Sequence, residues 1–248
     1  MKTVFINCSP KKRFCASAYF LSLQRLFTGG KKVSEKLRTP ADHERILEEV
    51  RSAQAVVFCL PLYVDGLPSH VLPFLEKMEA FCRQNDLHPH VYCIANNGFI
   101  EGRQNEPLMQ IFENFCSRAG LSWNGGVGIG GGVMLNVTRI LFVVQAGILL
   151  LNMILSAAKN GSFFPGDAWR SFGENAAILL FLNLGVLFYL VRLGFSIRKG
   201  SFFGKKYTRI LVPSFLFILF ADLFFFIISL FEGGLFRGWL SRKKYEEF

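Results

Sequence analysis

Residues 3–17 read TVFINCSPKKRFCAS, and this stretch decides the fold of the N-terminal half of the chain. Val4–Cys8 is a short, mostly apolar run, as is typical of a strand buried on both faces. A loop with three consecutive cations follows, and Ser17 then begins a helical pattern. Hydroxyl groups, backbone N–H groups and a helix N-terminus together favour a bound phosphate. The alternative is a solvated basic turn in which Ser17 caps the helix.

Apolar runs and helical patterns alternate outward from this stretch to about residue 132. The strand candidates are Val4–Cys8, Val33–Leu37, Ala55–Leu60, Val91–Ala95 and Val127–Ile129. The helix candidates, with an apolar period of 3.6 residues, are Ala18–Phe27, Asp42–Ala53, Ser69–Cys82 and Glu106–Ala119. This alternation predicts an α/β fold with a parallel sheet covered by helices on both faces. Ligands of such sheets bind beyond the carboxyl ends of the strands, where the strand order reverses.

Two further loops follow predicted strands and carry distinctive side chains. Tyr63 stands between Pro61 and Gly66, and an aromatic ring in that setting suits stacking on a planar ligand, although an ordinary turn has the same composition. The second loop is Asn96-Asn97-Gly98-Phe99. Its side-chain amides and exposed backbone N–H groups could bind the polar edge of a heterocycle.

Four motifs in this order resemble the flavodoxin-fold NAD(P)H-dependent FMN reductases, over about residues 1–132. The motifs are Ser9-Pro-Lys-Lys with Ser17, the run Ala55–Tyr63, Asn97-Gly98-Phe99, and Ala119-Gly-Leu followed by the glycine-rich stretch Gly125–Gly132. The resemblance implies an FMN cofactor, NAD(P)H as electron donor, and a quinone, a flavin or another small molecule as acceptor.

The resemblance also assigns binding roles to residues of this chain. Ser9, Lys11 and Ser17 would hold the FMN phosphate. Pro61, Leu62, Tyr63 and Val64 would border the isoalloxazine ring, and Asn97, Gly98 and Phe99 would lie along its polar edge. Gly131, within Gly130–Gly132, would allow close backbone approach. No catalytic residue is assigned, Tyr63 being only a candidate general acid, and no metal site is expected because none of the six cysteines has CxxC spacing.

The chain departs from the family pattern at three points. Cys8 precedes Ser9, where the family usually has glycine, and Asp65 would lower the flavin potential if it faced the ring. More importantly, a membrane-length apolar stretch begins near Leu135, where the family has a fifth helix that covers one sheet face. Either a second subunit covers that face, which makes us expect a homo-oligomer, or the membrane helix packs on it.

Three apolar stretches fill the C-terminal half. They are Leu135–Ala158, Ala176–Phe195 and Ile210–Phe231. Each is about 20 residues long, enough for a helix to cross ~30 Å of hydrocarbon. We therefore expect residues 1–132 to form the FMN-binding domain, 133–235 a three-helix transmembrane domain and 236–248 a basic tail, in a multi-pass protein of the cell membrane.

Charge predicts the orientation of the chain. Residues 1–132 hold 15 Lys/Arg and 12 Asp/Glu (+3), and residues 133–248 hold 13 and 6 (+7). The basic excess thus lies in the membrane half, which indicates contact with membrane lipid rather than nucleic acid. Ser196–Arg209 is interpreted as a short basic cytoplasmic loop, which agrees with a cytoplasmic N-terminal domain. The basic tail is consistent with either three crossings or a third segment that is re-entrant.

Three polar residues fall near the middle of the predicted spans. They are Gln145, Asn183 and Asp222. They form either a functional site or a hydrogen-bonded packing layer. The first interpretation supports an alternative function, in which the N-terminal domain is a non-enzymatic redox-sensing or assembly module of a small membrane transporter or channel.

Overall fold

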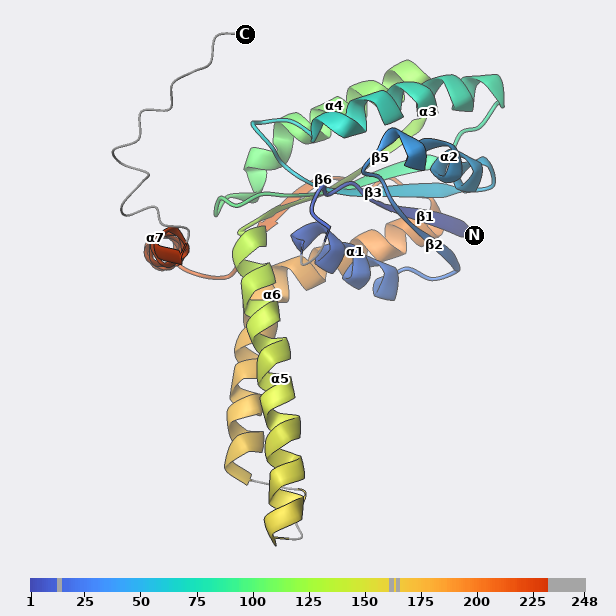
Figure 1. The fold of residues 1–248 in the computed structure, drawn as a ribbon. Coiled ribbons are helices and arrows are strands. Elements are labelled where there is room, and N and C mark those ends of the chain that lie inside the picture. Colours follow the sequence, from blue (N-terminus) through green and yellow to red (C-terminus); the bar gives the residue numbers. More distant parts are fainter. Residues whose placement is uncertain (13–14, 161–162, 164–165, 232–248) are drawn as a thin grey trace. The chain divides into compact units, whose positions relative to one another are not determined.

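The fold is built on a six-stranded sheet in the order β2-β1-β3-β4-β5-β6, with every pair parallel (Figure 1). This computed structural model describes residues 1–12, 15–160, 163 and 166–231. The strands are β1 Lys2–Asn7, β2 Lys31–Lys36, β3 Ala55–Pro61, β4 His90–Asn96, β5 Ser122–Gly130 and β6 Gly204–Arg209. The first five follow the flavodoxin-like order, which reverses between β1 and β3. The predicted flavodoxin-like α/β fold is confirmed.

Helices cover both faces of the sheet, as the alternating pattern predicts. They are α1 Ala16–Phe27, α2 His43–Arg51, α3 Leu72–Gln84 and α4 Glu106–Ala119, with short 3-10 turns at Pro40–Asp42, Ser69–Val71 and Gly102–Asn105. The core under α2, α3 and α4 is continuous, and its centre is Phe58 of β3, whose ring lies 6.3 Å from Phe74 and 4.9 Å from Phe112. Helix α1 lies on the opposite face (Figure 1).

Strand β6 is the largest departure from the sequence-based expectation. Residues 196–209 were expected to be a basic loop, but Gly204–Arg209 pairs with β5, from Gly125↔Gly204 to Gly130↔Arg209. The side chain of Lys205 is neutralised on the sheet, because its Nζ lies 2.9 Å from a carboxylate oxygen of Glu106 and 2.7 Å from one of Glu113. The loop interpretation is wrong, because cations that pair with α4 are compatible with an edge strand.

Two long helices connect β5 to β6. Helix α5, Gly132–Asn160, leads away from the sheet, and α6, Gly166–Lys199, returns to it (Figure 1). The second half of α6 runs along α1 on the sheet, where Val186, Leu190, Leu193 and Ile197 are buried. The face that lacked a fifth helix is therefore covered within the chain, by α6 rather than by α5 or a second subunit.

Asn183 of α6 packs against α1, and its place near the membrane midplane stays a prediction. Asn183 is buried, and its Oδ1 accepts a 3.1 Å hydrogen bond from the Tyr19 hydroxyl of α1. Gln145 lies between α5 and α6 with Asn175, in a shallow cavity.

Helix α7, Ser214–Phe231, belongs to a second compact unit that begins at Val212, whereas Met1–Leu211 form the first. The first compact unit thus extends beyond the expected boundary after residue 132, since β6 and the second half of α6 pack with the sheet. In the described part of the chain, α5, α6 and α7 are long and apolar enough to cross a membrane. Asp222 lies exposed on α7, and the expected tail 236–248 lies outside the described residues.

Candidate functional site

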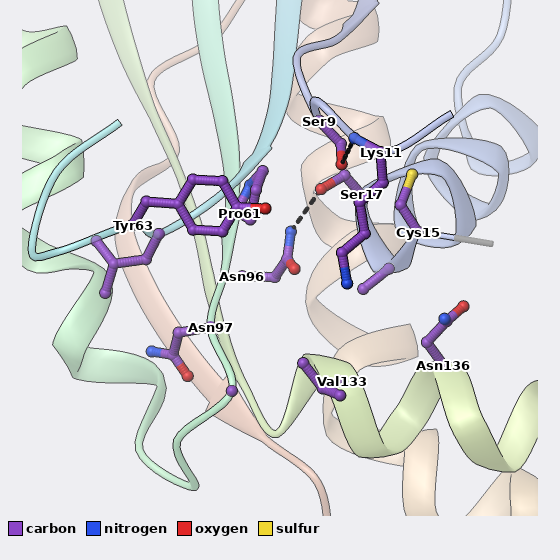
Figure 2. A pocket seen from close by; sticks show the side chains of 13 residues that line it. Ser9, Lys11, Cys15, Ser17, Pro61, Tyr63, Asn96, Asn97, Val133 and Asn136 are labelled. Atoms are coloured by element: carbon purple, nitrogen blue, oxygen red, sulfur yellow. Dashed lines mark hydrogen bonds between the residues drawn. The ribbon is translucent and has the colours of Figure 1, made fainter. Parts of the chain in front are cut away.

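A cavity of about 520 Å³, counted to its open mouth, lies at the carboxyl ends of β1, β3 and β4 (Figure 2). This is where the strand order reverses, so the topology itself creates a crevice between the loops. Eight of the predicted site residues line it: Ser9, Lys11, Ser17, Pro61, Leu62, Tyr63, Asn97 and Gly98. Cys15, Ala16, Asn96, Val133 and Asn136 complete the lining.

The first wall is the loop that leads from β1 into α1. Asn7 shapes it, because its Oδ1 accepts a 3.0 Å hydrogen bond from the N–H of Ser9. Ser17 is buried in the first turn of α1, and no side chain caps that helix. The first N–H groups of a helix have no partner within it, so this end of the pocket presents donors, a positive dipole end and the Lys11 ammonium together.

Arg38, just beyond β2, supports this loop from outside. Its Nη2 donates to the carbonyl oxygens of Lys11, at 2.9 Å, and Lys12, at 3.2 Å. Sequence reasoning missed this residue, because nothing near Arg38 in the sequence points to a loop 26 residues away. The contact ties the loop to the segment that follows β2.

The second wall follows β3. The N–H of Leu62 donates to the Asn96 carbonyl at 2.8 Å, and Tyr63 and Gly66 exchange two backbone hydrogen bonds across a tight turn. Val64 and Asp65 occupy the two central positions with φ of 46° and 56°, as a turn of this kind requires. Val64 is fully exposed at the tip and does not line the cavity, unlike the prediction for it.

Tyr63 carries the aromatic ring of this wall. Burial raises the pKa of its phenol, so the group stays protonated and uncharged at neutral pH. Its hydroxyl can therefore donate a hydrogen bond within the pocket.

The third wall follows β4. Asn96 donates through Nδ2 to the Ser17 hydroxyl, at 2.9 Å, and so ties this wall to the first (Figure 2). Asn97 donates to the Glu101 carbonyl at 3.0 Å, while its buried Oδ1 has no hydrogen-bond partner among the described residues. The pocket therefore holds a spare hydrogen-bond acceptor.

Phe99 and Gly131 do not reach the cavity. The carbonyl oxygen of Phe99 accepts a hydrogen bond from the N–H of Gly131, which has φ of +70° in the turn between β5 and α5. Only glycine adopts that conformation readily, so Gly131 shapes the turn that begins α5.

Helix α5 supplies the remaining wall, which sequence reasoning missed. Val133 and Asn136 lie in its first turns and face the pocket (Figure 2). Both residues lie at the start of a membrane-length apolar stretch, so their sequence context predicted contact with lipid rather than with a ligand. Cys15 and Ala16 lie within the predicted phosphate loop between Ser9 and Ser17, and Asn96 adjoins Asn97, but none of the three was assigned a binding role.

No family model matches this sequence, and no curated protein matches it. Among solved structures, the Trp repressor binding protein of Bacillus subtilis is similar at 20% identity and a TM-score of 0.44, covering 52% of this chain and 84% of that one. The NADPH-quinone reductase of P. pentosaceus has 14% identity and a TM-score of 0.44 (53% and 86% covered). The NAD(P)H:quinone oxidoreductase of Methanothermobacter marburgensis has 14% identity and a TM-score of 0.41 (56% and 92% covered). At these values, no functional argument follows from the similarity.

Proposed function

We propose that this protein is a membrane-anchored, FMN-dependent NAD(P)H oxidoreductase that passes electrons to a quinone, a flavin or another small acceptor. One observation carries the proposal. A single pocket joins an uncapped helix N-terminus, two hydroxyls and a lysine on one side to an aromatic wall and a spare amide oxygen on the other. A phosphate attached to a planar, polar heterocycle needs that combination.

The donor set fits FMN at both ends. Ser9, Lys11, Ser17 and the first turn of α1 would hold the phosphate, which gains from the helix dipole and the ammonium. Pro61, Leu62 and Tyr63 would flank the ring system. Asn97 Oδ1 would accept a hydrogen bond from a ring N–H, which would satisfy a buried atom that otherwise lacks a partner.

Bound FMN would supply hydride and electron transfer chemistry. The chain's own part is binding and orientation. Tyr63 would offer an uncharged hydroxyl from the ring wall as a hydrogen-bond donor, and Leu62 and Val133 would give the ring apolar contacts. Arg38 keeps the phosphate loop in place.

Bound flavin is directly measurable in the purified protein. We expect the detergent-purified chain to show flavin absorbance, and the double variant Ser9→Ala, Lys11→Met to bind FMN more weakly by ~2–3 kcal/mol, since two hydrogen bonds to a charged group are lost. The matched control is Lys36→Met, which removes an exposed cation from β2 and should leave affinity unchanged. Equal FMN affinity in the double variant and the control would refute the phosphate site.

The orientation is proposed from charge. Arg139, Arg192, Arg198 and Lys199 lie toward the sheet end of the hairpin formed by α5 and α6, as the positive-inside rule expects of a cytoplasmic domain. Cysteine at Phe163 should then react with an impermeant thiol reagent in intact cells, and cysteine at Lys199 should not. The six native cysteines are buried and should stay silent. The opposite labelling pattern would separate the pocket from cytoplasmic NAD(P)H and end the oxidoreductase proposal.

The second candidate is a redox-sensing module, and the wall built by α5 favours it. Because Val133 and Asn136 begin a helix long enough to span a membrane, a change of ligand state in the pocket would act directly on that helix. Rapid mixing of the FMN-loaded protein with NADPH or NADH separates the two candidates. Bleaching of the flavin absorbance within seconds, followed by turnover with an added quinone, supports the enzyme. Bound flavin that neither nucleotide reduces supports the sensor.

A further inference from the structure

The length of α6 exceeds what a membrane crossing requires. Its 34 residues extend about 51 Å at 1.5 Å per residue, whereas the hydrocarbon core is ~30 Å thick. The excess is the second half, which packs on the sheet beside α1 through Val186, Leu190, Leu193 and Ile197. Because this half packs on the sheet, it would lie outside the hydrocarbon, and the first half of α6 with α5 would be the inserted part.

The opposite side of this half-helix is also apolar, but it is exposed. Leu184, Phe188, Arg192, Phe195 and Lys199 repeat every three or four residues and form one stripe, which we call the outer stripe. Phe188 and Phe195 are 56% and 59% exposed, and Phe202, in the turn that follows, is 74% exposed. Large aromatic side chains grouped in this way mark an interaction surface rather than a solvated one.

The charge of the outer stripe is of one sign. From Asn175 to Phe203 the sequence contains Arg192, Arg198 and Lys199 and no Asp or Glu. The Arg192 guanidinium lies 5.6 Å from the centre of the Phe188 ring, so its stem follows the aromatic surface while its charged end is free to reach outward. Aromatic rings with interleaved cations and no acids are the composition of helices that lie in the interface of anionic membranes.

The placement of the stripe agrees with this composition. The hairpin of α5 and the first half of α6 projects from the side of the sheet that α1 and the second half of α6 cover, while α3 and α4 lie on the other side (Figure 1). A membrane crossed by the hairpin would therefore face the outer stripe.

We propose that the outer stripe, with Phe202, docks on the headgroup layer of an anionic membrane and holds the sheet domain flat against it. The inference rests on the proposed membrane anchoring, and it is independent of the flavin chemistry. Phe188, Phe195 and Phe202 enter the boundary between headgroups and acyl chains, and Arg192 and Lys199 pair with lipid phosphates.

Site-directed spin labelling of the full chain in vesicles tests this docking. Labels at Phe195, Ile178 and Leu72 report on the outer stripe, the hairpin and the opposite face near α3, and all three side chains are exposed, so substitution leaves the packing intact. In vesicles containing 30% phosphatidylglycerol, we expect the Ile178 label to be deep and the Leu72 label to be aqueous. The Phe195 label should lie at headgroup depth, with oxygen and nickel-chelate accessibilities between those of the Ile178 and Leu72 labels.

The outcomes distinguish the docking from the anchoring. A Phe195 label as aqueous as the Leu72 label, with Ile178 deep, would refute the docking and leave the anchor intact. An aqueous Ile178 label would refute both. Spin–spin broadening at Phe195 that disappears on dilution with unlabelled chain would assign the stripe to a second copy instead.

The cations provide a matched pair of variants. Arg192→Gln with Lys199→Gln should move the Phe195 label outward in anionic vesicles and remove the difference from neutral vesicles. Lys77→Gln with Arg83→Gln removes two cations from α3 and should change nothing. An equal shift of the Phe195 label in both double variants would show that net charge causes the shift, and it would overturn the assignment to the outer stripe.

Discussion

At the scale of single residues, Tyr92 of β4 connects the sheet to the returning helix. Its hydroxyl lies 3.1 Å from the Ser196 carbonyl and 3.0 Å from the Ser201 carbonyl, and it accepts a 3.1 Å hydrogen bond from Asn124. The side chain is fully buried, and burial raises the pKa of Tyr92 to about 12. The attachment of α6 and of the turn after it to β4 therefore depends on the neutral phenol of Tyr92.

Tyr92→Phe should lower the free energy of unfolding by ~1–3 kcal/mol, because buried carbonyls and an amide lose their partner. The raised pKa also sets a direction with pH. The protonated phenol is favoured in the fold, so its contribution is complete below the ordinary tyrosine pKa of ~10 and is lost as pH rises toward 12. Denaturant titrations at pH 8 and pH 11 should show a larger loss for the wild type than for the variant. An equal loss would contradict this role for Tyr92.

Gly194 gives a second prediction at this scale. A Cβ at Gly194 would collide with the Phe27 carbonyl group at the end of α1, whereas one at Gly173, in the same helix, meets no atom within 4 Å. We expect Gly194→Ala to destabilise the fold by ~1–3 kcal/mol, because α6 must move away from α1. Gly173→Ala should be neutral or stabilising by up to ~1 kcal/mol, as helix propensity predicts. Similar midpoints for both variants in thermal unfolding would contradict the close packing.

At the scale of elements, β6 is held by a group of charges on α4. Lys205 lies between Glu106 and Glu113, and the Tyr207 hydroxyl donates to Glu106. Burial acts to raise the pKa of Glu106, but hydrogen bonds from Lys205 and Gln110 outweigh it and hold the pKa below its ordinary value. The attachment of β6 at the sheet edge therefore depends on the ionised carboxylate of Glu106.

The attachment of β6 should weaken in acid. A carboxyl with a lowered pKa contributes stability that is present above its ordinary pKa of ~4.5 and lost as pH falls through the folded value. The protection of β6 amides against hydrogen exchange, relative to the intrinsic rate at each pH, should fall below pH 4.5, and Lys205→Met should lower it at pH 7 by about fivefold, equivalent to ~1 kcal/mol. Lys206→Met is the control, because the side chains of neighbouring strand residues point to opposite faces. Equal acceleration in both variants would assign the effect to net charge.

The elements also show where prediction from sequence succeeded and failed. The strand–helix alternation predicted α4 with its exact bounds, because that helix buries a periodic apolar face, and it located every strand from β1 to β5, of which β1, β3 and β4 are buried apolar runs. Strand β6 was not predicted, because Lys205, Lys206 and Arg209 make its sequence typical of a solvent-exposed loop. The packing of the second half of α6 on the sheet was not predicted either, because apolar residues such as Val186 and Leu190 are equally compatible with lipid and with a sheet core.

The candidate site was likewise predicted only in part. Ser9, Lys11, Tyr63 and Asn97 lie in loops whose composition is distinctive, and the structure brings them to one cavity. The resemblance also assigned Val64 and Phe99 to the ring site, but the turn and the loop that carry them place both outside the cavity lining. Which neighbour faces inward depends on local backbone angles, and composition does not determine those.

At the scale of the whole molecule, the sheet domain is discontinuous in sequence, because α5 and the first half of α6 are inserted before its last helix and strand. A fragment of residues 1–132 should aggregate, since it leaves the α6-covered face and the β5 edge open. A chain in which a flexible linker joins residue 131 to residues 186–211 should be better behaved in sizing experiments, because both surfaces are covered again. A soluble, monomeric 1–132 fragment would show that α6 and β6 are dispensable.

This discontinuity imposes an order on biosynthesis. A ribosome delivers the chain from the N-terminus, so β1 to β5 emerge first and β6 emerges only after both helices of the hairpin. The pocket walls from β1, β3 and β4 can form early, but the domain cannot close until the hairpin has turned back and delivered Val186–Arg209. If the hairpin crosses a membrane as proposed, completion of the fold would report that membrane integration has taken place, and a chain that failed to insert would stay recognisable to chaperones and proteases by its open sheet.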